Sequence, residues 1–236
     1  MSPEPKKPAR KPAAKKAKAK VEEDKTETRD DAALTAAVIE AALPHAAFDG
    51  FTDRVLEDAG KAAGLAKAEI ARLFPDGPLS LVAAWSKNID AEMEARLQAM
   101  DMPGMKIRAR ITEAVRARLS ILKRHKEAAR RAAALLSLPI HAGLAAKLMY
   151  ASVDAMWRAA GDISTDFNFY TKRGILAGVY GATLVRWFAD ASEDEAATNE
   201  FLAARIENVM QFEKFKAKAK DALSNFPAFA QWAKPK

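Results

Sequence analysis

The feature that most constrains the fold is the spacing of apolar residues, which recur at every third or fourth position in long segments of the 236-residue chain. Between Met105 and Leu138, for example, apolar side chains stand at Ile107, Ile111 and Val115. This spacing places them on one face of an α-helix. Strand-favouring runs of Val, Ile, Thr and Tyr are nearly absent. The sequence therefore predicts an all-α protein that is long enough to bury a substantial core.

The net charge of +7 is concentrated at the N-terminus, where eight Lys and Arg residues within residues 1–20 stand against Glu4 alone. The rest of the chain therefore has no net charge, which weakens a nucleic-acid-binding interpretation. Residues 1–30 are rich in Lys, Pro and Ala without apolar periodicity, and we expect them to be disordered. They either solubilise the chain or tether it to anionic lipid or nucleic acid. A mitochondrial presequence fits less well, because this segment is rich in Lys rather than in Arg and Ser.

Residue types that carry catalysis are scarce. The chain has no Cys, which excludes disulfides and thiolate sites. His45, His125 and His141 do not stand at spacings that place two metal ligands on one helix face. Neither a phosphate-binding Gly loop nor a nucleophile elbow occurs. We therefore predict a non-enzymatic protein without catalytic residues, metal or cofactor. No apolar run reaches the roughly 18 residues of a spanning helix.

Residues 31–78 have the layout of a helix-turn-helix module. A first helix is predicted over residues 31–42, with Pro44 ending or kinking it. Thr52 is a good N-cap for a second helix that reaches Ala63, and Gly64 is the expected stop. A short helix over residues 67–73 precedes a Pro/Gly turn. This segment resembles the N-terminal module of TetR-type proteins.

In TetR-type proteins the third helix reads DNA bases. Here that helix offers Lys67, Glu69 and Arg72 among Ala, Ile and Leu, without Asn, Gln or Tyr to bond base edges. We therefore expect no binding to a specific nucleic acid.

Residues 79–210 are predicted to form a domain of longer helices, over 79–100, 105–138, 142–160 and 166–190. Ser192 to Glu195 has the pattern of a capping box opening a further helix through Met210. The helix over 105–138 has a basic face, which is either a solvated surface or a site for phosphate or anionic lipid.

The most unusual stretch lies between Asp154 and Arg173. It reads Asp154-x-Met156-Trp157, then Gly161-Asp162-x-Ser164-Thr165-Asp166-Phe167-Asn168-x-Tyr170-Thr171-Lys172-Arg173. Its aromatic residues at a helix start cannot all face one core, so at least one is expected on the surface beside Asp166. The stretch resembles the signature of the coenzyme Q biosynthesis accessory family called "protein nine".

This resemblance implies a TetR-like protein that is not a repressor and forms homodimers through its C-terminal helical domain. It also implies binding of isoprenoid quinone precursors or phospholipid in an apolar cavity, and docking on the di-iron hydroxylase that acts on demethoxyubiquinone. The matched positions make these residues candidates for the docking surface: Asp154, Met156, Asp166, Phe169 and Tyr170. The implied location is peripheral on the cytoplasmic face of a bacterial inner membrane or, alternatively, on the matrix side of the mitochondrial inner membrane.

Two further residue sets follow from helical spacing. The candidate cavity wall consists of Met149, Val153, Trp157, Leu176, Val179, Tyr180 and Leu184. Residues 211–236 form an amphipathic C-terminal segment whose candidate membrane contacts are Phe215, Leu223, Phe226, Phe229 and Trp232. The alternative for that segment is packing on the protein's own core.

The sequence thus favours a lipid-binding accessory protein of ubiquinone biosynthesis, which presents isoprenoid intermediates to the hydroxylase. The alternative is a TetR-type transcriptional regulator with a hydrophobic effector pocket.

Overall fold

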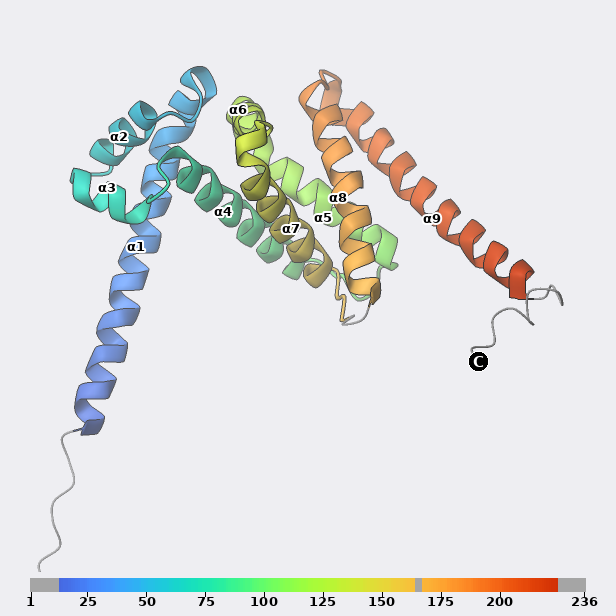
Figure 1. The fold of residues 1–236 in the computed structure, drawn as a ribbon, viewed down its shortest axis with the longest axis horizontal. Helices are drawn as coiled ribbons and strands as arrows, with labels where there is room; N and C mark the ends of the chain where they lie inside the picture. Colours follow the sequence, from blue (N-terminus) through green and yellow to red (C-terminus); the bar gives the residue numbers. More distant parts are fainter. Residues whose placement is uncertain (1–12, 164–166, 225–236) are drawn as a thin grey trace, which may run out of the picture. The chain divides into compact units, whose positions relative to one another are not determined.

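The computed structural model describes residues 13–163 and 167–224, and within them it contains α-helices, three short 3-10 helices and no strand. The α-helices, labelled in Figure 1, are α1 (Ala13–Asp49), α2 (Asp53–Ala62), α3 (Lys67–Leu73), α4 (Pro78–Gln98), α5 (Ile107–Leu122), α6 (Lys126–Leu136), α7 (Ala142–Ala159), α8 (Phe167–Phe188) and α9 (Ala196–Ser224). The all-α class predicted from apolar spacing is confirmed.

The chain divides into two compact units, Met1–Ala84 and Trp85–Lys236. The division falls inside α4, whereas the sequence analysis placed the boundary between residues 78 and 79, at the end of the Pro/Gly turn. A Pro/Gly turn marks where a helix begins, but which core each residue of that helix joins depends on packing.

In the first unit, α2 and α3 pack closely together and α1 packs on α2. Thr52 caps α2 as predicted, because its hydroxyl accepts a hydrogen bond from the Val55 N–H at 3.3 Å. Gly64 adopts a φ of +79° after the helix, where a residue with a side chain would be strained. Gly60 allows the close contact of α2 with α3, since a Cβ atom there would lie 2.3 Å from Ile70 Cδ1.

The first helix is longer than the sequence analysis expected. It begins at Ala13 and continues to Asp49, with Pro44 inside it. The expected disorder of residues 1–30 therefore differs from the structure over residues 13–30, while residues 1–12 lie outside the described part. The expectation relied on missing apolar periodicity, but Ala, Lys and Glu have high intrinsic helix propensity without it.

In the second unit, α7, α8 and α9 follow one another as neighbouring antiparallel helices, and α5 packs against α7 and α9 (Figure 1). The most deeply buried large side chains of this unit include Trp187, Met93, Leu97, Met156 and Leu202. The helix predicted over 105–138 is interrupted at Lys123–His125 and becomes α5 and α6. His125 has non-helical backbone angles there, and no Pro or Gly marks this bend in the sequence.

The start of α9 corrects another expectation. Asp190, not a capping box, provides the main cap: its Oδ2 accepts from the Thr198 N–H at 2.7 Å and from the Thr198 hydroxyl at 2.5 Å. Glu195 instead accepts from Trp187 Nε1 at 2.6 Å.

Hydrogen bonds from Ser192 and Thr198 hold the pKa of the Asp190 carboxyl well below its ordinary value. Its stabilising effect is therefore present above the unfolded-state pKa of about 3.9 and is lost as pH falls toward the folded one.

Candidate functional site: an apolar pocket and the turn between α7 and α8

An apolar pocket lies among four helices of the second unit. Its empty space is about 480 Å³, part of which is open to solvent. The lining consists of Ile107, Arg108 and Ile111 of α5, Trp157 of α7, Lys172, Ile175, Leu176 and Val179 of α8, and Ile206, Val209 and Met210 of α9. Because apolar atoms form its wall, the pocket fits a hydrocarbon group better than a polar one.

Three of the residues predicted to wall a cavity line this pocket, namely Trp157, Leu176 and Val179. The other four lie elsewhere. Val153 is buried in the core, and the Tyr180 hydroxyl is bonded to Arg118. Met149 lies beside Gly181, where a Cβ atom would be 3.8 Å from Met149 Cε, and Leu184 is half-buried. These four residues do not line this pocket, because helical spacing does not say which neighbour each face meets.

Sequence reasoning missed the walls supplied by α5 and α9. Ile107 and Ile111 stand four positions apart, as do Ile206 and Met210, so each pair shares one helix face. That spacing was visible in the sequence. The approach of those faces to α8 was not, because α5 ends at Leu122 and α9 begins at Ala196, far apart in the sequence.

The signature residues form an ion-pair cluster at the turn between α7 and α8. The Arg173 guanidinium donates to Asp154 Oδ1 at 2.7 Å and to Asp162 Oδ2 at 3.1 Å. The side chains of Arg173 and Asp162 are only 3% and 4% exposed. A nearly inaccessible arginine between two carboxylates fixes the geometry of the turn, because its charge-assisted hydrogen bonds join α8 to Asp154 of α7 and to Asp162 of the turn.

Lys172 extends this cluster to the pocket. Its ammonium donates to Asp162 Oδ1 at 2.9 Å and lies 5.4 Å from the centre of the Trp157 ring. The Trp157 indole N–H donates to the Lys172 carbonyl at 3.2 Å. Since Trp157 and Lys172 both line the pocket, the pocket wall and the signature cluster share two side chains.

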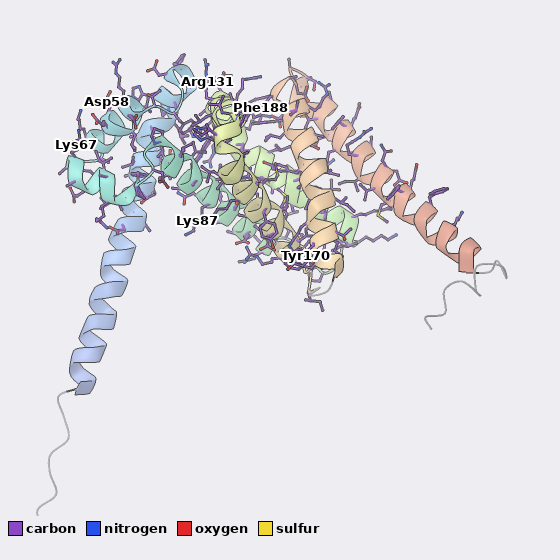
Figure 2. The ribbon with its side chains drawn as sticks, in the orientation of Figure 1. Asp58, Lys67, Lys87, Arg131, Tyr170 and Phe188 are labelled. Atoms are coloured by element: carbon purple, nitrogen blue, oxygen red, sulfur yellow. The ribbon has the colours of Figure 1, made fainter. Side chains whose placement is uncertain are left out.

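An exposed aromatic edge lies on the other side of Arg173. The guanidinium stacks 3.3 Å from the centre of the Phe169 ring, and that ring meets Tyr170 edge-on at 5.1 Å. Tyr170 is 68% exposed, and Ile163 on the preceding turn is 94% exposed. Figure 2 shows Tyr170 at the beginning of α8, at the opposite end of this helix from Phe188.

The five candidate docking residues therefore differ in accessibility. Tyr170 is exposed, Phe169 is half-buried under Arg173, and Asp154 is half-buried in ion pairs with Arg173 and Arg158. Met156 is fully buried, so its assignment to a docking surface was wrong. Its position in the signature reflects core packing, because it lies on the inward face of α7. Asp166 lies outside the described residues.

A second buried polar cluster, which the sequence did not reveal, lies in the core of the same unit. Arg118 donates to Asp90 Oδ1 at 2.7 Å, to the Ser86 hydroxyl at 3.0 Å and to the Tyr180 hydroxyl. Ser152 completes it by donating to Asp90 Oδ2 at 3.0 Å. Burial raises the pKa of the Tyr180 hydroxyl, although the charge of Arg118 opposes this. All these side chains have partners, so the cluster joins α4, α5, α7 and α8 without an open ligand position.

The C-terminal part of α9 exposes two aromatic rings, Phe212 at 62% and Phe215 at 69%. Leu223 lies in α9, but its side chain is not described, and Phe226, Phe229 and Trp232 lie outside the described residues. Membrane contact by this segment stays a prediction. In the described part of the chain no single helix is long and apolar enough to cross a bilayer, while one bent pair, 107–136 with 139–159, meets that test by length and composition.

The charged residues of α3 form hydrogen bonds and ion pairs with other residues of the first unit. Arg72 forms a two-pronged ion pair with Asp31, both distances being 2.6 Å. Lys67 lies 3.6 Å from Glu57, and Glu69 accepts from the Ala66 N–H at 2.8 Å. Over residues 13–163 and 167–224 no group of His, Asp and Glu side chains could hold a metal ion.

Comparison with known proteins confirms the family resemblance. Residues 142–213, which include α7, α8 and the first part of α9, match the COQ9 family model. The chain is 31% identical over 179 residues to "Ubiquinone biosynthesis protein COQ9, mitochondrial" of Rattus norvegicus, covering 73% of this chain and 57% of that protein. Identity to the Bos taurus protein of the same name is 32% over 180 residues, covering 73% and 56%. The chain thus spans little more than half the length of these curated relatives.

The fold is also similar to a solved structure, that of a TetR transcriptional regulator from Nitrosomonas europaea ATCC 19718. The TM-score is 0.59 at 19% sequence identity, and the match covers 73% of this chain and 95% of that one. This likeness confirms the TetR-like all-α fold, and at this identity it says nothing of DNA binding.

Proposed function

The chain carries a COQ9 family domain over residues 142–213, and from that premise we propose that it acts in ubiquinone biosynthesis as a lipid-binding accessory protein. In this proposal it holds the isoprenoid chain of a quinone intermediate in the apolar pocket and presents the intermediate to the demethoxyubiquinone di-iron hydroxylase. The observation that carries the proposal is the pocket itself, whose α7, α8 and α9 walls all lie within the matched segment.

The physical need for such a carrier follows from the substrate. Each CH₂ group moved from water to an apolar environment gains about 0.8 kcal/mol, so a polyprenyl chain does not leave a membrane for water unaided. A pocket walled by Ile111, Leu176 and Val209 replaces lipid contacts with protein contacts. The protein then lowers the free-energy cost of moving the polyprenyl group out of the membrane without catalysing a reaction, which is why we propose a non-enzymatic role.

The exposed edge of the α7–α8 turn is the proposed docking surface for the hydroxylase. Tyr170 presents a large aromatic side chain whose ring meets Phe169 edge-on, and Arg173 covers the Phe169 ring. A Tyr side chain has only two rotatable torsions, so it loses little conformational entropy on binding, and Tyr is enriched among residues that dominate interface energies. This assignment keeps Tyr170 and Phe169 from the predicted set and leaves out Met156.

Membrane association and dimerisation complete the proposal. The exposed rings of Phe212 and Phe215 support a peripheral contact of α9 with a lipid surface, and the homodimer is expected from the family resemblance. The relatives are named as mitochondrial proteins, which supports the mitochondrial inner membrane over the bacterial one expected first.

The geometry of α3 favours this role over transcriptional regulation. A base-reading helix needs side chains free to reach base edges. Arg72 is held by Asp31, and Glu69 bonds the backbone of its own helix start.

The test is mass spectrometry of lipids that co-purify with the full chain and with two variants. Val209→Glu places a carboxylate in the pocket wall, whereas Asn208→Glu adds the same charge one position away on the exposed face of α9. We expect isoprenoid quinone intermediates with the unmodified chain and with Asn208→Glu, and at least a tenfold loss with Val209→Glu, because burying an unpaired carboxylate is costly. Lipid-free protein, or equal lipid in both variants, would overturn the proposal.

A further inference from the structure

The residues shared by the pocket and the signature cluster suggest more than a passive binding site. Trp157 and Lys172 line the pocket, and the same two side chains hold the start of α8. A continuous series of contacts then runs from Lys172 through Asp162 to Arg173, and from Arg173 through the Phe169 ring to Tyr170. Every step is a hydrogen bond, ion pair or ring contact between residues of the second unit.

We infer that an isoprenoid group bound in the apolar pocket stabilises the α7–α8 turn through Trp157 and Lys172. The exposed edge of this turn, which bears Tyr170, is then held most firmly when the pocket is filled. This inference rests on the proposed function, because it assumes that the pocket takes an apolar chain. It adds a regulatory property to that site, namely a favourable coupling between lipid binding and partner docking.

The physical cause is the change in solvent around Lys172. Its side chain is 39% exposed, while its partner Asp162 is 4% exposed. A hydrocarbon chain lying along Trp157 and the Lys172 stem would exclude water from one side of this ion pair. Charge attraction strengthens as the local dielectric falls, and the Lys172 position over the indole ring becomes more favourable for the same reason.

The strengthened pair has a defined effect on the turn. Asp162 accepts from both Lys172 and Arg173, so holding Asp162 more firmly also restricts Arg173. Arg173 in turn donates to the Phe169 carbonyl at 3.2 Å and covers the Phe169 ring. The first turn of α8, which bears Tyr170, therefore opens less often when the pocket is filled. Because coupling is reciprocal, a partner that stabilises this turn also tightens lipid binding by the same factor.

The experiment follows two quantities separately in the full chain, with farnesol as the probe. Isothermal titration calorimetry measures whether farnesol binds, and hydrogen–deuterium exchange measures the backbone amides of Thr171 to Leu176. We expect farnesol at saturation to slow exchange of these amides by about fivefold or more. Lys172→Met keeps the apolar stem but removes the charge, so at a farnesol concentration that titration of this variant shows to be saturating, the slowing should fall below twofold.

Lys147→Met is the matched control. Lys147 is exposed on α7 and does not line the pocket, so its replacement should leave both farnesol binding and the slowing of exchange intact. If Lys172→Met does not fold, Asp162→Asn tests the same contact from its other side and should also reduce the slowing.

The outcomes separate this inference from the proposed function. Farnesol binding without slower exchange in the unmodified chain would overturn the coupling and leave the lipid-binding role standing. Unchanged slowing in Lys172→Met would overturn the path through Lys172. Failure of farnesol and of a longer isoprenoid alcohol to bind would overturn the lipid-binding role together with the coupling.

Discussion

Two buried arginines of the second unit, Arg118 and Arg173, show how similar chemistry can serve different parts of a fold. Both are nearly inaccessible, with side chains 7% and 3% exposed, and both bind carboxylates at 2.7 Å. Arg118 lies between helices in the core and also bonds two hydroxyl groups, those of Ser86 and Tyr180. Arg173 lies at the end of a helical hairpin and covers an aromatic ring beside an exposed tyrosine.

The difference lies in what surrounds each cluster. The Arg118 cluster lies among α4, α5, α7 and α8, so a substitution in it should lower the stability of the whole second unit. The Arg173 cluster has the apolar pocket on one side and an exposed edge on the other, so a substitution in it should destabilise mainly the turn between α7 and α8. Burial of an ion pair alone therefore carries no functional argument, whereas the position of the Arg173 cluster between a pocket and an exposed aromatic side chain supports the proposed function.

The largest effect is expected from Arg118→Met. The substitution leaves the Asp90 carboxylate buried without its ionic partner and removes the bonds to Ser86 and Tyr180. We expect a loss of about 3–5 kcal/mol in the free energy of unfolding, measured by urea denaturation. Arg124→Met, which removes an exposed pair with Glu92, should cost less than about 1 kcal/mol. Equal losses in the two variants would show that the core cluster is not special.

A smaller effect is expected from Arg173→Met. Asp162 would keep Lys172 as a partner, and Asp154 would keep Arg158. We expect about 2–3 kcal/mol of destabilisation, with faster hydrogen exchange confined to the end of α7 and the start of α8. Arg158→Met removes a more exposed guanidinium from the same carboxylate and serves as the control. If exchange rose across the whole second unit, the distinction between the two clusters would fail.

The smallest effect on stability is expected from Tyr170→Ala, because its side chain is largely exposed. The unfolding free energy should change by no more than about 0.5 kcal/mol. Under the proposed function, affinity for the purified demethoxyubiquinone hydroxylase should fall about 30-fold, as calorimetry would measure, since a loss of about 2 kcal/mol is typical of a dominant interface residue. Tyr150→Ala, on the exposed face of α7, should leave affinity unchanged. Wild-type affinity in Tyr170→Ala would move the docking surface elsewhere.

Much of the architecture was predictable because it depends on short-range information. The third helix was predicted over residues 67–73 and is observed over Lys67–Leu73, since a Gly stop before it and a Pro/Gly turn after it are local signals. The signature between Asp154 and Arg173 indicated the family because it is a long run of specified residues. The same run could not separate Met156, which packs in the core, from Tyr170, which faces solvent.

What the sequence by itself determined is most of the helices, their apolar faces and the family resemblance, since each follows from residues close together in the chain. Only the tertiary structure decided which faces meet. The pocket needs α5 and α9 to pack together beside α7 and α8, and the core cluster needs Asp90, Arg118 and Tyr180 from three helices. Helical periodicity gives the direction of a side chain relative to its own helix axis, while the partner of that side chain depends on how separate helices pack.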